Sequence, residues 1–299
     1  MALRSFLYRR ANRWQRSDGD LAAGRATRRG GCSVLVDFHS HTNASDGTLK
    51  PNALLDFMHA RGVQIFAITD HDTLAAFGEL QPRSGIKVVT GIEINSTFRD
   101  GEVHILGYAL PLGPSALDSV LERNRAARRV RIGRIVSQLR DAGHAITLED
   151  VEYEAAPQAS LGRPHVGKAL IRKGIVADIE TAFRSFLRRG RPGYVPSTHI
   201  TPHEAIDVIL KVGGVPVLAH PGRLRDEAII GELADRGLQG LEVFYPTHDS
   251  NAVHHFREIA QRHRLVMTGG SDFHDIRYHT RGVGMEIADA DIAPFLSLL

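Results

Sequence analysis

Residues 34–41 read Val-Leu-Val-Asp-Phe-His-Ser-His, an apolar run that ends in two histidines separated by one residue. Side chains alternate between the two faces of a strand, so His39 and His41 share one face if Val34–Phe38 is a strand. Imidazole nitrogens are common ligands of transition metals. This stretch therefore predicts a β-strand that presents a pair of metal ligands at its carboxyl end.

Six further apolar or β-branched runs follow, which we expect to be strands: Ile65–Thr69, Lys87–Ile94, Val103–Tyr108, Pro216–Ala219, Leu241–Phe244 and Leu265–Thr268. Helical patterns lie between several of them, as in Pro51–Arg61, Thr201–Val212 and Asn251–Arg262. Alternating strands and helices are typical of parallel strands with helical crossovers. The sequence therefore predicts an α/β barrel.

In almost every case, side chains that can bind metals lie at or just beyond the carboxyl ends of these runs, and the fourth run holds His104. The set is His39, His41, Asp46, His71, Glu93, His104, His220, Asp272 and His274. Each alone is weak evidence, because Asp46 could be an ordinary turn residue and His220 could end a strand before proline. The carboxyl ends of parallel barrel strands meet at one mouth, however. Because buried charges need partners, the set as a whole predicts a metal cluster at that mouth.

The alternation stops between residues 111 and 194, where a long amphipathic helix over Leu117–Ala142 precedes shorter helical segments. Its buried stripe would contain Val120, Leu121, Ile132, Ile135, Val136 and Leu139, and its solvated face would contain Arg128, Arg129, Arg131 and Arg134. The segment has 15 basic and 9 acidic side chains. We therefore expect a basic helical insertion at 111–194, here called the cap, in a barrel formed by 34–110 and 195–299.

Residues 1–33 contain eight arginines against Asp18 and Asp20, and they lack the apolar core of a secretory signal. We expect a disordered basic extension there. No apolar run approaches the roughly 20 residues of a membrane-spanning helix. The single cysteine, Cys32, excludes an internal disulfide framework. These features favour a cytoplasmic protein with no membrane contact and no obligate protein partner.

The ordered motifs resemble the PHP family (polymerase and histidinol phosphatase) of metal-dependent phosphoesterases. The matching pieces are Asp37-Phe38-His39-Ser40-His41, Ser45-Asp46-Gly47, Thr69-Asp70-His71-Asp72, Gly91-Ile92-Glu93, His104, Ala219-His220-Pro221 and Ser271-Asp272-Phe273-His274. The resemblance covers nearly everything from Val34 onward and implies a distorted seven-stranded (β/α)7 barrel with a helical insertion domain. The insertion, with Arg163-Pro164-His165, is similar to the branch that removes phosphate from nucleoside 3′,5′-bisphosphates and that can degrade short 5′-phosphorylated RNA.

The resemblance also implies three divalent ions. The first would bind His39, His41, Asp272 and a bridging Glu93, the second Glu93, His104 and His220, and the third Asp46, His71 and His274. Mixed nitrogen and oxygen ligands suit Mn²⁺, which we place first, or Zn²⁺ or Fe²⁺, and disfavour Ca²⁺. A hydroxide that bridges two ions would be the nucleophile, held by Glu93 with His39, His41, Asp272, His104 and His220 around it.

Outside the ligand set, Arg163 and His165 match the family motif for phosphate binding, and Arg223 follows the strand end at His220. Guanidinium groups bind phosphate through two parallel hydrogen bonds. We interpret Asp37, Asp70 and Asp72 as carboxylates that orient the ligating imidazoles. The leaving group needs a proton or a metal, and the sequence does not single out the acid that would supply the proton.

Three other functions can be compared with this set of residues. A histidinol-phosphate or other small phosphomonoester phosphatase shares the metal motifs, but the basic cap favours a substrate with two phosphates or an RNA 5′ end. An amidohydrolase usually has a bridging lysine where this chain has Glu93. A non-catalytic metal-binding accessory module should have lost ligands, and none of the nine is missing. The sequence has no nucleotide-binding P-loop, nucleophile elbow or dinucleotide-binding glycine motif.

Overall fold

The structure is a computed structural model that describes residues 33–99, 101–277 and 282–299. The expected disordered extension therefore lies, except for Ser33, outside the described residues. The strands of the described part are β1 (Ser33–Asp37), β2 (Ile65–Ile68), β3 (Lys87–Phe98), β4 (Gly101–Tyr108), β5 (Val215–Leu218), β6 (Gly240–Phe244), β7 (Val266–Gly269) and β8 (Met285–Ala288). They form one sheet in the order β7-β6-β5-β4-β3-β2-β1-β8.

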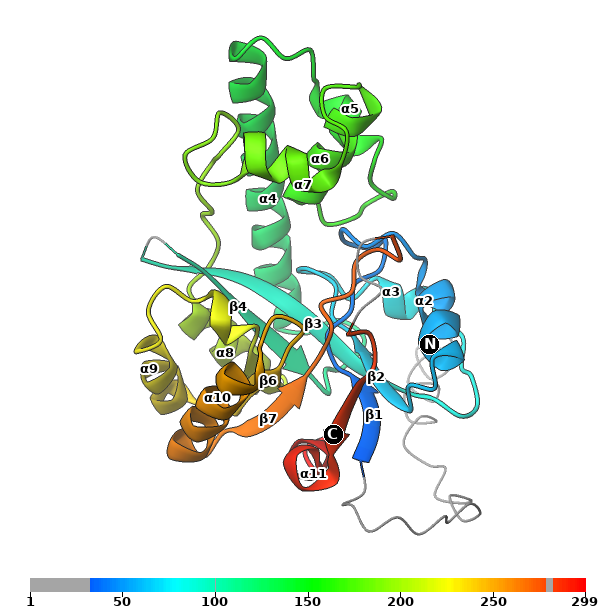
Figure 1. The fold of residues 1–299 in the computed structure, drawn as a ribbon, viewed down its shortest axis with the longest axis vertical. Coiled ribbons are helices and arrows are strands. Elements are labelled where there is room, and N and C mark those ends of the chain that lie inside the picture. The colour runs from blue at the N-terminus through cyan, green and yellow to red at the C-terminus, as the bar shows by residue number, and fades with distance from the viewer. Residues whose placement is uncertain (1–32, 100, 278–281) are drawn as a thin grey trace, which may run out of the picture. The chain divides into compact units, whose positions relative to one another are not determined.

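The sheet curls into a nearly closed barrel, shown in Figure 1. Beyond the last residue of β1, the backbone N–H of Phe38 donates to the carbonyl of Gly269 at the end of β7 (3.0 Å). A parallel bridge between Ser40 and Phe273 continues this contact. The carboxyl ends of the first and seventh strands thus join at one rim, as a barrel requires.

The α/β barrel prediction is confirmed, and all seven expected strands are present, but the strand directions and number needed correction. β4 runs antiparallel to both β3 and β5, because only two residues separate Phe98 from Gly101 and a parallel crossover needs a dozen or more. The eighth strand, β8, pairs antiparallel with β1. Its four residues carry too little pattern to be recognised from sequence alone.

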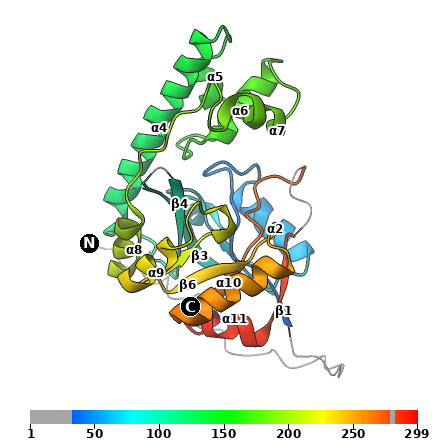
Figure 2. The same ribbon diagram turned by 60° about the vertical axis from the view of Figure 1, so that its left-hand side comes forward.

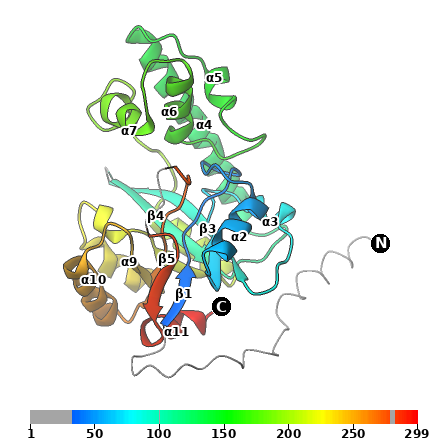
Figure 3. The same ribbon diagram turned by 45° about the vertical axis from the view of Figure 1, so that its right-hand side comes forward.

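Helices cover the outside of the barrel: α2 (Pro51–Ala60), α3 (Ala76–Glu79), α8 (Pro202–Lys211), α9 (Ile229–Arg236), α10 (Ser250–His263) and α11 (Asp289–Leu296), with a 3₁₀ turn, η3 (Pro221–Arg223), after β5. Figure 3 shows α2 and α3 on one side of the barrel and α9 and α10 on the other. Local sequence fixes the start of α8, where Thr201 and Glu204 form a reciprocal capping box and Pro202 fills the first turn. None of the described helices is long and apolar enough to cross a membrane.

The segment between β4 and β5 holds α4 (Leu117–Asp141), α5 (Leu148–Glu152), α6 (Arg163–Arg172), α7 (Ile179–Ala182) and the π-helical turn η2 (Phe183–Leu187). Figure 2 shows these helices above the rim, with α4 descending along the barrel. The expected apolar stripe of α4 is buried. Its first part, with Leu117, Val120 and Leu121, packs into the barrel core. Its later part, with Ile132 and Ile135, packs into a separate core of the cap.

Candidate metal centre

The His-x-His pair lies at the barrel rim with both imidazoles fully buried. The Nε2 atoms of His39 and His41 are each 3.3 Å from Oε2 of Glu93, which comes from β3. The same two atoms lie 3.4 and 3.2 Å from Oδ1 of Asp272, which follows β7. Four ligand-type side chains from three strands therefore converge on one point.

Glu93 is the centre of the whole cluster. Its Oε2 lies 3.0 Å from Nδ1 of His71, and its Oε1 lies 2.7 Å from Nδ1 of His104 and 3.1 Å from Nε2 of His220. The glutamate is 1% exposed. A carboxylate surrounded by five imidazoles can bridge neighbouring cations, because each of its oxygens faces a different subset of rings.

Asp46 forms the outer part of the cluster. Its Oδ1 is 3.2 Å from Nε2 of His274, and its Oδ2 is 3.7 Å from Nε2 of His71. His41 stacks on His274, with ring centroids 4.1 Å apart. The nine candidate ligands thus form one continuous group at the rim.

The reversed direction of β4 explains how His104 reaches this group. We expected His104 within a strand parallel to its neighbours, but it lies in the first half of an antiparallel strand, opposite Asn95 of β3. In an antiparallel strand the first half points toward the rim where its neighbours end. The residue was placed correctly at the mouth for a wrong reason.

Buried polar atoms without hydrogen-bond partners test whether a metal fits. They include Nε2 of His39 and His41, Nδ1 of His71, Oε2 of Glu93 and Oδ1 of Asp46. Unsatisfied buried polar atoms are rare in folded proteins, and each needs an explanation. Here they face one another and form three groups whose ligand atoms lie within 4.8 Å: His39, His41, Glu93 and Asp272; His41, Asp46, His71 and His274; and His71, Glu93 and His104. The donor set fits divalent cations.

These groups differ in part from the expected division of ligands. The first contains the four residues expected for one ion. The second adds His41 to the expected Asp46, His71 and His274. In the third, His71 joins Glu93 and His104, and His220 lies outside the group, although it contacts the same Glu93 oxygen as His104.

The carboxylates of the cluster are ionised, whereas its imidazoles differ in charge. Burial alone would raise the pKa of Glu93, but His71 and His39 hold that pKa well below its usual value, so the carboxylate is ionised. Burial lowers the pKa of His71 to about 4, against the opposing effect of Glu93, and leaves a neutral imidazole. Asp272 keeps a lowered pKa despite burial because His39 and His274 lie beside it. Ionised carboxylates and neutral imidazoles are the forms that bind metals.

Burial lowers the pKa of His39 and of His41, but Glu242 and Glu93 hold that of His39 well above its usual value, and Asp272 and Glu93 raise that of His41 to about 10. A cation would have to displace these two protons.

Left-handed backbone conformations mark the loops that carry these ligands. Asp72 (φ 53°), His220 (φ 29°) and Asp272 (φ 54°) all have positive φ although none is glycine. Such conformations are strained and persist where the surroundings impose them, most often at functional sites. The rim loops are therefore held in shape by their neighbours.

Glu242 on β6 is a site residue that the sequence reasoning missed. Its Oε1 lies 3.0 Å from Nδ1 of His39, and its Oε2 accepts the backbone N–H of His220 (2.7 Å). With Nδ1–H directed at Glu242, Nε2 of His39 keeps its lone pair for a cation. The available signal was an acidic residue inside the apolar run Leu241–Phe244, which could be buried only with a partner.

The three aspartates expected to orient imidazoles hold the rim loops, and Asp70 also reaches the ring of His41 through Ser45, whose hydroxyl donates to Asp70 and lies 3.5 Å from Nδ1 of His41. Asp37 accepts the hydroxyl and backbone N–H of Ser271, and Asp70 accepts those of Thr42. Asp72 bonds to Arg128, Asn124 and the N–H of Asn95. Their orienting role stays a prediction, and the loop contacts add a second role that the sequence did not indicate.

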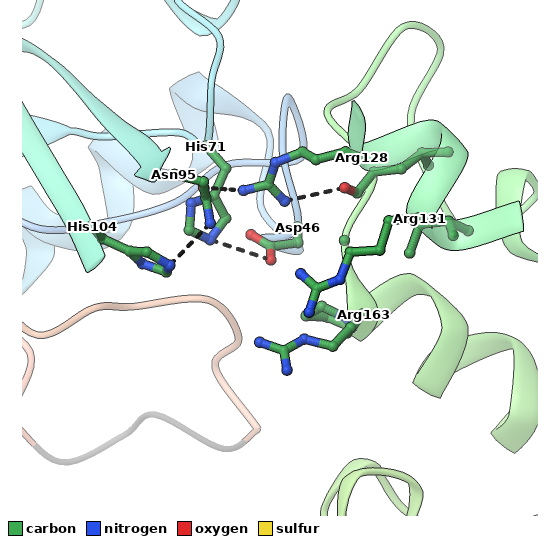
Figure 4. A pocket seen from close by; sticks show the side chains of 11 residues that line it. Asp46, His71, Asn95, His104, Arg128, Arg131 and Arg163 are labelled. Atoms are coloured by element: carbon green, nitrogen blue, oxygen red, sulfur yellow. Dashed lines mark hydrogen bonds and ion pairs between the residues drawn. The ribbon is translucent and has the colours of Figure 1, made fainter. Parts of the chain in front are cut away.

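A small cavity of about 60 Å³ lies between the cluster and the cap. Figure 4 shows His71, His104 and Asp46 on one side and Arg128, Arg131 and Arg163 on the other. The expectation of a wholly solvated arginine face on α4 was wrong. Arg128 and Arg131 are 6% and 8% exposed, whereas Arg129 and Arg134 face solvent.

The buried arginines of α4 are held by specific partners. Arg128 pairs with Asp72 (Nε to Oδ2, 2.7 Å), donates to the carbonyl of Leu161 and contacts Oδ1 of Asn95. The amide of Asn95 lies 3.0 Å from Nε2 of His104. Through Asn95, these contacts connect the cap to His104, a candidate metal ligand.

Of the three expected phosphate-binding residues, Arg163 lines the cavity, whereas His165 is placed differently. His165 is 1% exposed, and its Nδ1 accepts the backbone N–H of Gly162 at the start of α6. Burial lowers its pKa to about 4, so the ring is neutral. Arg223 lies at the other side of the rim, with Nη1 3.2 Å from Oδ2 of Asp272, above the ring of Tyr245.

Comparisons with known proteins agree with this geometry. The PHP domain family matches residues 37–155. The chain is 32% identical to a 3′,5′-nucleoside bisphosphate phosphatase of Chromobacterium violaceum, over 83% of this chain and 90% of the relative. It is 33% identical to the 5′-3′ exoribonuclease Rnm of Salmonella typhimurium, over 81% and 86%. It is 34% identical to a phosphoribosyl 1,2-cyclic phosphate 1,2-diphosphodiesterase of Eggerthella lenta, over 81% and 94%.

A solved structure from Bifidobacterium adolescentis, assigned as a metal-dependent phosphoesterase, has the same fold. The TM-score is 0.80 at 30% identity, and the match covers 90% of this chain and 98% of that one. The motifs at the rim, the barrel that positions them and these relatives lead to one conclusion. The chain belongs to the PHP family.

Proposed function

We propose that this protein is a metal-dependent phosphoesterase that removes phosphate from nucleoside 3′,5′-bisphosphates. The observation that carries the proposal is the cavity, which has candidate metal ligands on one wall and the guanidinium groups of Arg131 and Arg163 on the other. Such a cavity suits a substrate with two phosphates, one for each wall. The named activities of the relatives from Chromobacterium and Salmonella support this substrate class.

Three divalent ions would be held by the nine rim residues, with Mn²⁺ as first choice and Zn²⁺ or Fe²⁺ as alternatives. Bound divalent ions would supply positive charge to the phosphoryl oxygens and lower the pKa of water at the site. Glu242 keeps the ring of His39 oriented. Asp37 and Asp70 hold the loops that carry His39 and His41.

The cap would bind the phosphate that is not cleaved. A 3′,5′-bisphosphate and a 5′-phosphorylated RNA have a terminal 5′-phosphate in common, so we assign this group to Arg163 and Arg131. Arginine presents several fixed N–H donors to a phosphate. Arg223 lies beside Asp272 on the opposite side of the rim and would contact the reacting phosphate.

Phosphate release from a substrate panel tests the proposal. The panel contains adenosine 3′,5′-bisphosphate, adenosine 5′-monophosphate, histidinol phosphate, a phosphoribosyl 1,2-cyclic phosphate and a short RNA with or without a 5′-phosphate. We expect the highest kcat/KM for the bisphosphate and cleavage of RNA only when its 5′-phosphate is present. A preference for histidinol phosphate or the cyclic phosphate would reject the proposed substrate.

The Arg163→Ala variant separates the two phosphates. Loss of a hydrogen bond to a charged group costs about 1.5–3 kcal/mol, or roughly ten- to a hundredfold in kcat/KM. This loss should appear for the bisphosphate and not for a monophosphate held by the metals alone. An unchanged ratio of the two kcat/KM values would show that Arg163 does not read the second phosphate.

A further inference from the structure

Glu102 forms an ionic contact between barrel and cap that the proposed function does not use. It lies on β4, two residues before His104 and therefore on the same face of the strand. Its Oε1 is 2.7 Å from Nη2 of Arg131 on α4, and its Oε2 is 2.8 Å from Nη2 of Arg163 on α6. One barrel carboxylate thus contacts both arginines to which we assign the second phosphate.

Glu102 lies outside the cavity that contains the metal ligands. Arg131 and Arg163 line the cavity that contains His71 and His104, whereas Glu102 does not. Glu102 instead lines a second cavity of about 160 Å³, whose other walls include Phe98 and Leu224. The carboxylate therefore contacts the guanidinium groups of Arg131 and Arg163 from outside the first cavity.

Glu102 forms an aligned hydrogen bond with only one of the two arginines, Arg163. Nη2 of Arg131 is buried and close to Glu102, yet it makes no aligned hydrogen bond. An ion pair with poor hydrogen-bond alignment keeps its Coulomb attraction, but it gains less than an acceptor in line with the N–H would give. A carboxylate offers two acceptor oxygens, whereas a phosphate monoester offers three and a larger charge. A terminal phosphate therefore satisfies this pair better than Glu102 does.

We propose that Glu102 competes, within the molecule, with the uncleaved phosphate for Arg131 and Arg163, and thereby weakens binding of the product. The inference rests on the proposed function. The uncleaved phosphate is present in both substrate and product, so its contacts bind both equally and do not accelerate the reaction. Two arginines without a counter-charge would retain the mononucleotide product. Glu102 offsets part of their charge, displaces the product and keeps the site available for the next substrate.

The Glu102→Gln variant tests this role, because it removes one negative charge with little change of shape. We measure the inhibition constant of adenosine 5′-monophosphate, the KM of adenosine 3′,5′-bisphosphate, and direct binding of the monophosphate to the metal-loaded protein by calorimetry. Removal of a carboxylate beside a phosphate dianion should strengthen binding about tenfold. We expect all three constants to fall by a similar factor, because both ligands carry the 5′-phosphate.

Two further variants separate charge from geometry. Glu102→Asp keeps the negative charge on a shorter side chain, so its constants should stay within about threefold of wild type. Glu152→Gln removes a carboxylate that pairs with Arg129 elsewhere in the cap, and it should leave the constants unchanged. Weaker or unchanged monophosphate binding in Glu102→Gln overturns the inference, as does an equal change in Glu102→Gln and Glu102→Asp.

The same measurements in Arg163→Ala distinguish failure of this inference from failure of the proposed function. If wild type and Arg163→Ala bind adenosine 5′-monophosphate equally, the cap does not hold the 5′-phosphate and the proposed function fails. If binding depends on Arg163 but Glu102→Gln does not strengthen it, only the role of Glu102 is rejected.

Discussion

At the barrel rim, His39, His41 and Glu93 are almost completely buried and approach one another from different strands. Across the cavity, Arg163 extends from a helix of the cap, and over a quarter of its side chain is exposed. The rim is built by backbone bridges between strand ends and by loops in strained conformations. The cap is built by helices around a core of its own. This difference indicates that the rim places the ligands rigidly, whereas side chains of the cap can adjust to the substrate.

Removal of a rim carboxylate should have the largest effect. Asp272 lies within 3.5 Å of the rings of His39, His41 and His274. We expect Asp272→Ala to lower kcat/KM by more than about a thousandfold, because loss of one ligand displaces a catalytic cation. Phosphate release and circular dichroism measure activity and fold together. Near wild-type activity in a folded variant would contradict the metal centre.

The dependence on metal can be checked without a substitution. Dialysis against a chelator should remove activity, and addition of Mn²⁺ should restore it. The matched comparison is the thermal stability of the cap variant Arg163→Ala, which should respond to the metal as wild type does. Full activity in a metal-free preparation would refute a catalytic role for bound cations.

A pair of glycine substitutions compares rigidity in the two regions. A Cβ at Gly270, beside the rim, would lie 2.3 Å from Cβ of His39 and 2.4 Å from its backbone nitrogen. We expect Gly270→Ala to cost more than about 3 kcal/mol of unfolding free energy. A Cβ at Gly133 on α4 meets nothing within 4 Å, so Gly133→Ala should stabilise by about 0.5–1 kcal/mol. Urea unfolding measures both, and similar values would remove the contrast.

Acid should act on the cap through His165. Its pKa falls from 6.5 to about 4 on burial, so the folded state excludes the proton that the unfolded state binds. The resulting stability, about 3 kcal/mol, is present above pH 6.5 and is lost as pH falls toward 4. His165→Gln keeps an acceptor for Gly162 without titrating. Its unfolding free energy should fall less between pH 7 and 4 than that of wild type, and parallel curves would contradict the assignment.

The smallest effect is expected for residues 1–32. All candidate ligands and cavity residues lie beyond them. A chain that begins at Ser33 should keep its kcat/KM within about twofold, since it retains every candidate ligand and every described residue that lines the cavity. A tenfold loss in a folded protein would show that the extension takes part in catalysis.

The sequence predicted what depends on local periodicity and failed where partners are distant. Alternation along the first strand placed His39 and His41 on one face, and the 3.6-residue period found the buried stripe of α4. Glu242 was missed because its partner His39 lies 203 residues away. The burial of Arg128 was missed because it depends on Asp72, 56 residues earlier in the chain. Tertiary contacts, rather than composition, decide whether a charged side chain is buried.

The length and continuity of helix α4 limit how the cap can move. At 1.5 Å per residue its 25 residues span about 37 Å. Side chains of this one helix pack into both the barrel core and the cap core. A rigid cap rotation would therefore have to bend an unbroken helix, which has no proline to weaken it. Access to the cavity should depend on side chains and rim loops rather than on a swinging lid. Excision of residues 111–194 would also take Leu117, Val120 and Leu121 out of the barrel core.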